Sequence, residues 1–385
     1  MASTSMASPR VLAGLVVFAL ALAACGTDVE NQAGTGSDVA EAGGADASEG
    51  GDLDDDAGDD DAAADADDAE VVDPAASVVA TVSPIADLVA QVGGDRVEVT
   101  SLVPAGADAH TYEPRPQDVV ALSEADAYLG IGLDLNDGAL QLAEERLPDG
   151  APLVLLGELA LDDDDLVFDH SHDDGDGHGH SHDDGDGHGH SHDDDHAHGD
   201  DELGPNPHVW TSVRNAAGLV DAIAETLSEI DPDGATTYED AATSYLDDLD
   251  DLDQRIAAAT ETIPDDARTL VTYHDAWTYF ARDYGLEYAT AVQPTDLSDP
   301  SASEVREVID LVRDLEVPVV FGSEEFPTPV LERIAEETGA AYVDDLADDV
   351  LPGEPGDPEH TYLELMRRNA ATIVDALGGD ASELG

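Results

Sequence analysis

The sequence contains no lysine and only 13 arginines, against 90 aspartates and glutamates, in 385 residues. Phosphate binding depends on clustered Lys and Arg side chains, so a formal net charge of -77 excludes nucleic acid as a partner. The same imbalance disfavours attraction to an anionic lipid surface. Aromatic residues make up only 4% of the chain, which indicates that part of it does not build a packed core.

Cysteine is almost absent as well. The single residue, Cys25, excludes an internal disulfide and a cysteine-based zinc ribbon. It follows an apolar run at 11–24 that is too short for a membrane span of about twenty residues but suits the core of a signal peptide. Leu22-Ala23-Ala24-Cys25 resembles the lipobox of exported lipoproteins, and the alternative is a secretory signal with an incidental Cys. Because two or more acyl chains anchor stably, we expect cleavage after residue 24 and lipidation of Cys25 at the outer face of the cell membrane.

An acidic stretch lies directly after the signal, which we assign to residues 1–25. Residues 26–73 hold 18 acidic residues and no basic one, with mostly Ala, Gly and Ser between them. Such a segment has no apolar periodicity and cannot bury enough surface to offset its ordering entropy. We therefore expect residues 26–74 to form a disordered, extended tether.

From residue 75 the chain alternates between short apolar runs and helical periodicity. This pattern predicts an α/β fold with parallel sheets. We expect two α/β lobes, at 75–235 and 265–382, joined by one long helix at 236–260. The predicted strands are 78–82, 97–103, 127–131, 153–156, 269–273, 288–292, 317–321 and 340–343, and the predicted helices are 84–92, 116–124, 215–230, 277–284, 302–315, 328–338 and 362–377.

A histidine-rich, low-complexity insert at 162–202 interrupts the first lobe. It contains ten of the 14 histidines, and a decapeptide that starts at His170 repeats at His180 and begins again at His190. Composition and repetition predict a flexible, exposed segment. Neutral imidazoles bind metal ions, so we expect weak auxiliary sites; a solvated charge run is the alternative. The ten residues are His170, His172, His178, His180, His182, His188, His190, His192, His196 and His198.

Four histidines lie outside the insert, and three of them stand in loops next to predicted strands or helices. His110 follows the strand at 97–103, His208 precedes a helix, and His274 ends a strand. Parallel α/β sheets place ligands beyond such strand ends. Three imidazoles and a carboxylate, such as Asp344, suit a tetrahedral divalent ion. Taken singly, each His is equally well explained as a solvated or capped loop residue.

The motifs around these residues resemble the metal-binding substrate-binding proteins of bacterial zinc and manganese ABC transporters. The resemblance covers residues 77–380 in order, and the two segments that contain His110 and His208 are its most specific parts. It implies two lobes linked by a rigid helix, with the metal held in the cleft between them. The motifs are Val79-Ala80-Thr81, Ser83-Pro84-Ile85, Leu102-Val103-Pro104, Gly106-Ala107-Asp108, His110-Thr111-Tyr112-Glu113-Pro114, Asn206-Pro207-His208-Val209-Trp210, Tyr273-His274-Asp275-Ala276-Trp277, Glu336-Glu337-Thr338-Gly339 and the segment 361–369.

By this resemblance the metal ligands are His110, His208, His274 and Asp344, with the adjacent Asp345 as the alternative to Asp344. His360 matches no ligand of the family, and we interpret it as a solvated loop residue. The family's usual Leu-Asp-Pro after the second motif is replaced by 211–213, Thr-Ser-Val, which can still cap the next helix.

The third histidine favours zinc over manganese. Manganese-type members commonly carry Glu at the position of His274, and oxygen ligands suit manganese while imidazole suits zinc. The resemblance therefore implies an extracytoplasmic, monomeric receptor that delivers Zn²⁺ to an ABC permease and its ATPase. A manganese receptor and a surface metal-storage or adhesion lipoprotein are the alternatives. The chain has no phosphate-binding Gly-Lys loop, so ATP would be hydrolysed by another subunit.

We expect no enzymatic activity. A hydrolytic zinc site keeps one coordination position open for water, whereas a carboxylate here would close the shell. The sequence also lacks a His-Glu-x-x-His helix and a Gly-x-Ser-x-Gly turn.

The acidic tether and the insert together hold fewer than half of the acidic residues. The folded part is thus itself strongly acidic, and we interpret this as a halophilic surface whose self-repulsion is relieved by salt screening. Thermal unfolding of the metal-free protein across a salt series checks this hypothesis, and full stability at low salt would count against it.

Overall fold

The computed structural model describes residues 73–105, 107–161, 165–168, 204–293, 300–323 and 329–385. The predicted signal with Cys25, nearly all of the tether and the ten histidines of the insert lie outside the described residues. Among the described residues, no helix combines the length and the apolar character needed to cross a membrane.

The first sheet has four parallel strands in the order β2-β1-β3-β4. They are β1 (Ala76–Ala80), β2 (Val97–Ser101), β3 (Ala127–Gly130) and β4 (Leu153–Leu155). The helices of this part are α1 (Ser83–Gly93), α2 (Pro116–Glu124), α3 (Asp137–Arg146) and α4 (Leu156–Ala160). The central strand β1 is strongly apolar because both of its faces are covered.

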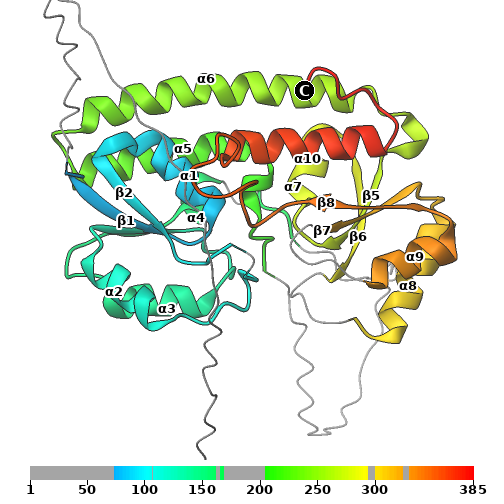
Figure 1. The fold of residues 1–385 in the computed structure, drawn as a ribbon, viewed down its shortest axis with the longest axis horizontal. Coiled ribbons are helices and arrows are strands. Elements are labelled where there is room, and N and C mark those ends of the chain that lie inside the picture. Colours follow the sequence, from blue (N-terminus) through cyan, green and yellow to red (C-terminus); the bar gives the residue numbers. More distant parts are fainter. Residues whose placement is uncertain (1–72, 106, 162–164, 169–203, 294–299, 324–328) are drawn as a thin grey trace, which may run out of the picture. The chain divides into compact units, whose positions relative to one another are not determined.

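The second sheet repeats the arrangement, with four parallel strands in the order β6-β5-β7-β8 (Figure 1). Its strands are β5 (Thr269–His274), β6 (Glu287–Gln293), β7 (Val319–Ser323) and β8 (Ala341–Leu346). Its helices are α7 (Thr278–Tyr284), α8 (Ala302–Asp314), α9 (Pro329–Thr338) and α10 (Tyr362–Ala376). In each sheet the strand that comes first in the sequence, β1 or β5, is a central strand. The chain adds the next strand on one side of it and the remaining two on the other side, so a topological switch point lies beside β1 and beside β5.

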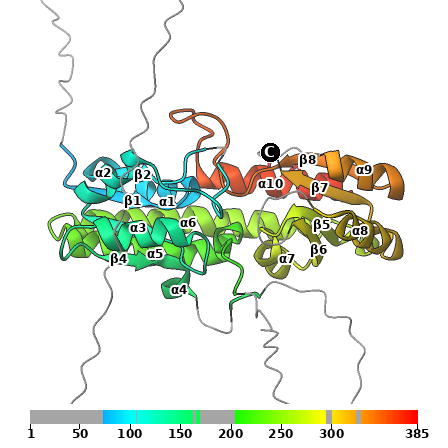
Figure 2. The same ribbon diagram turned by 90° about the horizontal axis from the view of Figure 1, so that it is seen from below.

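Two helices follow the first sheet in the chain, and the longer one connects the lobes. The helix α5 (Val213–Ile230) packs against α1 and α4, and the 26-residue α6 (Ala235–Thr260) packs against α5, α1, α7 and α10. Figures 1 and 2 both show α6 running past the two sheets. Its buried stripe includes Tyr238, Tyr245, Leu249, Leu252 and Ile256, which recur at helical spacing. One helix packed on both lobes therefore fixes their separation.

The two-lobed α/β fold predicted from the sequence is confirmed. Two short helices were missed. The sequence of α3 is acidic with a weak apolar stripe, and its start is set by Asn136, whose Oδ1 accepts a hydrogen bond from Ala139 N at 2.6 Å. α4 has only five residues, too few for a periodic signal. Ser301 and Glu304 form a capping box at the start of α8, and Ser212 caps α5 by accepting from Asn215 N at 3.2 Å.

Candidate metal centre

His274 is the last residue of β5, a central strand of the second sheet. Every residue of this strand except Thr269 is buried, and His274 is only 3% exposed. The carboxyl end of β5 lies at the topological switch point, where neighbouring strands connect in opposite directions and leave room for a ligand. The sheet itself therefore delivers one imidazole to the centre of the molecule.

His208 lies between the lobes, immediately before a short 3-10 turn at Val209–Thr211, and is 1% exposed. Asn206 Oδ1 accepts hydrogen bonds from the backbone N and from the ring Nδ1 of His208, each at 3.0 Å. Asn206 Nδ2 donates to Asp275 O at 2.6 Å, which identifies Oδ1 as the acceptor. The ring therefore carries its proton on Nδ1, and Nε2 presents a lone pair.

His110 comes from the loop that follows β2 and is the most accessible of the three, being half-buried. The side chain of Asp108 organises this loop. Its Oδ1 accepts from His110 N at 2.9 Å and its Oδ2 accepts from Thr111 Oγ1 at 2.6 Å. Asn136 Nδ2 donates to Ala109 O, so the loop is also fixed from the side of α3.

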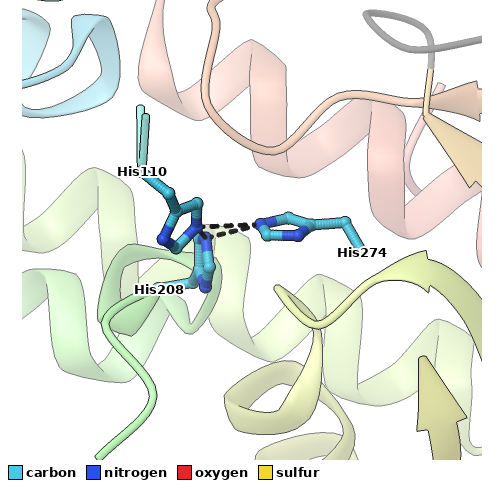
Figure 3. Close-up of side chains that lie close together, drawn as sticks. All are labelled: His110, His208 and His274. Carbon is cyan, nitrogen blue, oxygen red and sulfur yellow. Dashed lines mark hydrogen bonds between the residues drawn. The ribbon is translucent and has the colours of Figure 1, made fainter. Parts of the chain in front are cut away.

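The three imidazoles meet through their Nε2 atoms (Figure 3). The Nε2 atoms of His110 and His208 lie 3.2 Å apart, those of His110 and His274 3.3 Å, and those of His208 and His274 2.8 Å. A tetrahedral zinc ion with Zn–N bonds of about 2.0–2.1 Å needs nitrogen atoms about 3.3 Å apart. Residues separated by 98 and 66 positions in the chain thus bring their Nε2 atoms close enough together that they could hold a metal ion, with the His208–His274 pair closer than in an ideal shell.

The structure does not bring Asp344 to these histidines. Asp344 and Asp345 are both exposed on β8, which is the edge strand of its sheet. The prediction assumed that one of the pair points into the cleft by strand alternation. Instead the chain passes Leu346 and then turns, and the buried carboxyl group belongs to Asp349, whose Oδ1 lies 3.8 Å from His208 Nε2. A short acidic pair between apolar residues, Asp348-Asp349 before Leu351, was the signal that sequence reasoning missed.

Hydrogen bonds from both lobes hold the turn that carries Asp349. Trp210 Nε1 donates to Asp348 O at 2.8 Å, and Asn369 Nδ2 donates to Ala347 O at 2.6 Å. Ser83 at the start of α1 bonds to the backbone on both sides, with Oγ donating to Asp349 O at 3.3 Å and accepting from Leu351 N at 3.1 Å. The carboxyl group is therefore set at a fixed position relative to His208.

Burial shifts the proton affinities of this pair in opposite directions. The pKa of His208 lies well below its usual 6.5, first because the ring is desolvated and then because of His274 and His110 beside it. The pKa of Asp349 lies well above 3.8, first because of burial and then because of the charges of Asp348 and Asp108. Among the described residues, no donor satisfies Asp349 Oδ1. A cation between these groups would stabilise the ionised carboxylate.

His360 stands apart from this cluster. Its Nδ1 donates to Pro352 O at 3.1 Å in the loop before α10, and the group of histidines that could hold a metal consists of His110, His208 and His274 among the described residues. The interpretation of His360 as a loop residue agrees with this placement.

Two parallel-sheet lobes, a long helix packed on both, and three convergent imidazoles define a class of protein, the metal-binding receptor. The family model described as zinc-uptake complex component A, periplasmic, matches residues 78–376, and the chain belongs to this family of receptors for ABC import systems.

Known relatives agree with this assignment. The high-affinity zinc uptake system protein ZnuA of Paracoccus denitrificans is 33% identical over 320 residues, which cover 79% of this chain and 92% of that protein. The manganese-binding lipoprotein MntA of Halalkalibacterium halodurans is 27% identical over 300 residues, covering 78% and 88%. The solved periplasmic zinc-binding protein TroA from Treponema pallidum superposes with a TM-score of 0.65 at 25% identity and covers 78% of this chain and 99% of that chain.

Proposed function

We propose that this protein is an extracytoplasmic zinc receptor that delivers Zn²⁺ to an ABC permease. The observation that supports zinc is the set of three buried or half-buried imidazoles whose Nε2 atoms lie 2.8–3.3 Å apart. Neutral imidazole is a favoured zinc ligand, while manganese prefers oxygen donors. We take Asp349, in place of Asp344, as the fourth ligand, because its Oδ1 is buried beside His208 and lacks a donor among the described residues.

A manganese receptor is the second candidate, because a relative that covers most of this chain is named as manganese-binding. The composition of the site argues against it. In the described part of the chain, the carboxyl group that pairs with His208 is that of Asp349. The third histidine, His274, offers an imidazole nitrogen at a position where an oxygen ligand would favour manganese.

Transport needs no bond chemistry from this chain. The lone pairs on the three Nε2 atoms replace water molecules around the ion, and the carboxylate of Asp349 supplies the anionic ligand. His208 stays neutral because its pKa is lowered by burial, so it does not need to lose a proton before it binds. The loaded receptor then docks on the permease, and release requires one ligand to be displaced.

Competition between the two metals tests this proposal. Full-length protein freed of metal is titrated with zinc and with manganese, with bound metal measured after dialysis. We expect equimolar zinc to displace manganese and excess manganese to leave zinc in place, as expected for a nitrogen-rich site. Tighter binding of manganese would overturn the assignment of the metal and leave the receptor role standing.

Removal of the histidine-rich stretch should separate weak from tight binding. Residues 169–203 are deleted and Phe168 is joined to Gly204, which is a short closure because Phe168 already pairs with Pro205. We expect one tight zinc site to remain and several weak sites to disappear, since the insert acts as a tethered second binding region. Equilibrium dialysis gives the stoichiometry. An unchanged number of bound zinc ions would refute the role of the insert.

Lipid attachment rests on one residue. Cys25→Ser is expected to release the protein from the membrane or to leave its signal uncleaved, because the thiol that would carry the acyl chain is missing. Fractionation of cells that produce the wild-type and variant chains measures this directly. A variant that is processed at the normal position and still fractionates with membranes would refute lipidation at Cys25.

A further inference from the structure

Asn206 is the residue at which three separate parts of the chain are joined. Its backbone N donates to Val167 O at 2.7 Å, and its backbone O accepts from Tyr279 Oη on α7 at 2.8 Å. The first of these bonds fixes it to the segment 165–168 that leads into the histidine-rich stretch, and the second fixes it to the second lobe. The residue is 1% exposed. The backbone of Asn206 is thus anchored on both sides, while its side-chain amide makes separate contacts.

This amide controls the ring of His208. Its Oδ1 accepts from the backbone N and from Nδ1 of His208, both at 3.0 Å. A ring that donates Nδ1–H has its lone pair on Nε2, the atom that faces the other two histidines. Asp275 is also a backbone hydrogen-bond partner of His208, so loss of Asn206 Oδ1 leaves the ring with one acceptor fewer and weakens the preference for a proton on Nδ1. A ring that carries its proton on Nε2 cannot bind a metal ion through that atom.

The same amide also reaches the strand that carries His274. Its Nδ2 donates to Asp275 O at 2.6 Å, one residue after His274. The side chain of Asn206 therefore bonds both to the ring of His208 and to the backbone beside His274. The Nε2 atoms of these two histidines lie only 2.8 Å apart. Asn206 therefore links the ring of His208 to the backbone beside His274 and contributes to the spacing of this pair.

We propose that Asn206 is a positioning residue of the metal centre, which fixes the tautomer of His208 and the spacing between His208 and His274. The proposal rests on the proposed function as a receptor for a divalent cation. Groups that orient metal-binding histidines typically contribute about 10–100-fold to metal affinity. Asn206 contacts no metal itself and acts only through the two histidines.

The test compares Asn206→Ala and Asn206→Asp with the full-length wild-type protein. The Asp side chain retains an acceptor for Nδ1–H and loses the donor to Asp275 O, whereas Ala loses both. We expect Asn206→Ala to weaken zinc binding by about 10–100-fold, measured by competition with a chelator, and Asn206→Asp to recover part of that loss. In the cobalt-loaded proteins, Asn206→Ala should also reduce the intense visible absorption of a tetrahedral site, and Asn206→Asp should restore it.

Tyr279→Phe is the matched control, because it removes the hydroxyl that bonds to Asn206 O and leaves the amide intact. It should retain the wild-type affinity and cobalt spectrum. Thermal unfolding of each metal-free protein shows whether a variant is folded. Wild-type affinity and spectrum in a folded Asn206→Ala, or equal losses in Tyr279→Phe, would overturn the positioning role alone. A wild-type protein that binds neither metal would overturn the receptor function together with it.

Discussion

His208→Ala is expected to lower zinc affinity by about 10²–10³-fold, because a binding free energy of about 10–16 kcal/mol is shared among four ligands. His208 is the central member of the site. Its Nε2 lies 3.2 Å from that of His110, 2.8 Å from that of His274 and 3.8 Å from Asp349 Oδ1. The His208 side chain is only 1% exposed, so its truncation to Ala leaves a buried gap beside the other described histidines of the site.

Chelator competition with the full-length protein measures this loss, and the variant without residues 169–203 shows it free of the weak sites. His360→Ala is the matched control, since this histidine bonds to Pro352 O and lies outside the cluster. We expect the control to bind zinc as the wild type does. Equal affinities for His208→Ala and the wild type would show that the tight site lies elsewhere.

Asp349→Asn should move two measured quantities in opposite directions. Zinc affinity falls by about 10²–10³-fold, because an anionic ligand is replaced by a neutral amide. The metal-free protein becomes more stable at neutral pH. The pKa of Asp349 is raised in the folded state, so above about pH 3.8 the unfolded chain ionises this carboxyl group more readily than the folded protein does. This difference destabilises the metal-free fold as the pH rises from 3.8 towards the raised pKa, and Asn removes it.

Asp344→Asn is the matched control for this prediction. Its carboxyl group is exposed on β8, so the substitution should change neither zinc affinity nor the stability of the metal-free protein at neutral pH. Thermal unfolding with and without zinc, at pH 4 and pH 7, measures both effects. The stabilisation by Asp349→Asn should be larger at pH 7 than at pH 4. Loss of binding in Asp344→Asn with none in Asp349→Asn would make Asp344 the fourth ligand after all.

The fold was largely readable from the sequence because apolar runs and helical stripes repeat in a regular order. Buried strands such as β1 and β5 contain mostly apolar and β-branched residues, and α6 shows a long stripe. The start of α6 was predicted one residue too late. The helix begins at Ala235, and the residue before it, Gly234, has no side chain that could cap it.

The site was predictable only in part. Histidines that are 164 positions apart, such as His110 and His274, can be brought together only by the fold, and the family motifs supplied that information. No motif was recognised around Asp349. Its position depends on how many residues the chain uses to leave β8 and turn back towards Trp210, and strand alternation says nothing about a turn. Sequence reasoning therefore predicted a carboxylate ligand on β8, whereas the carboxyl group that we propose lies in the turn that follows this strand.

The central claim is that one zinc ion is shared by His110, His208, His274 and Asp349. A crystal structure of the variant lacking residues 169–203, loaded with one equivalent of zinc and measured on both sides of the zinc absorption edge, tests it most directly. We predict one strong anomalous peak about 2.0–2.1 Å from each of the three Nε2 atoms and about 2.0–2.2 Å from a carboxylate oxygen of Asp349. A peak outside this cluster, or a fourth ligand from Asp344 or Asp345, would contradict the account.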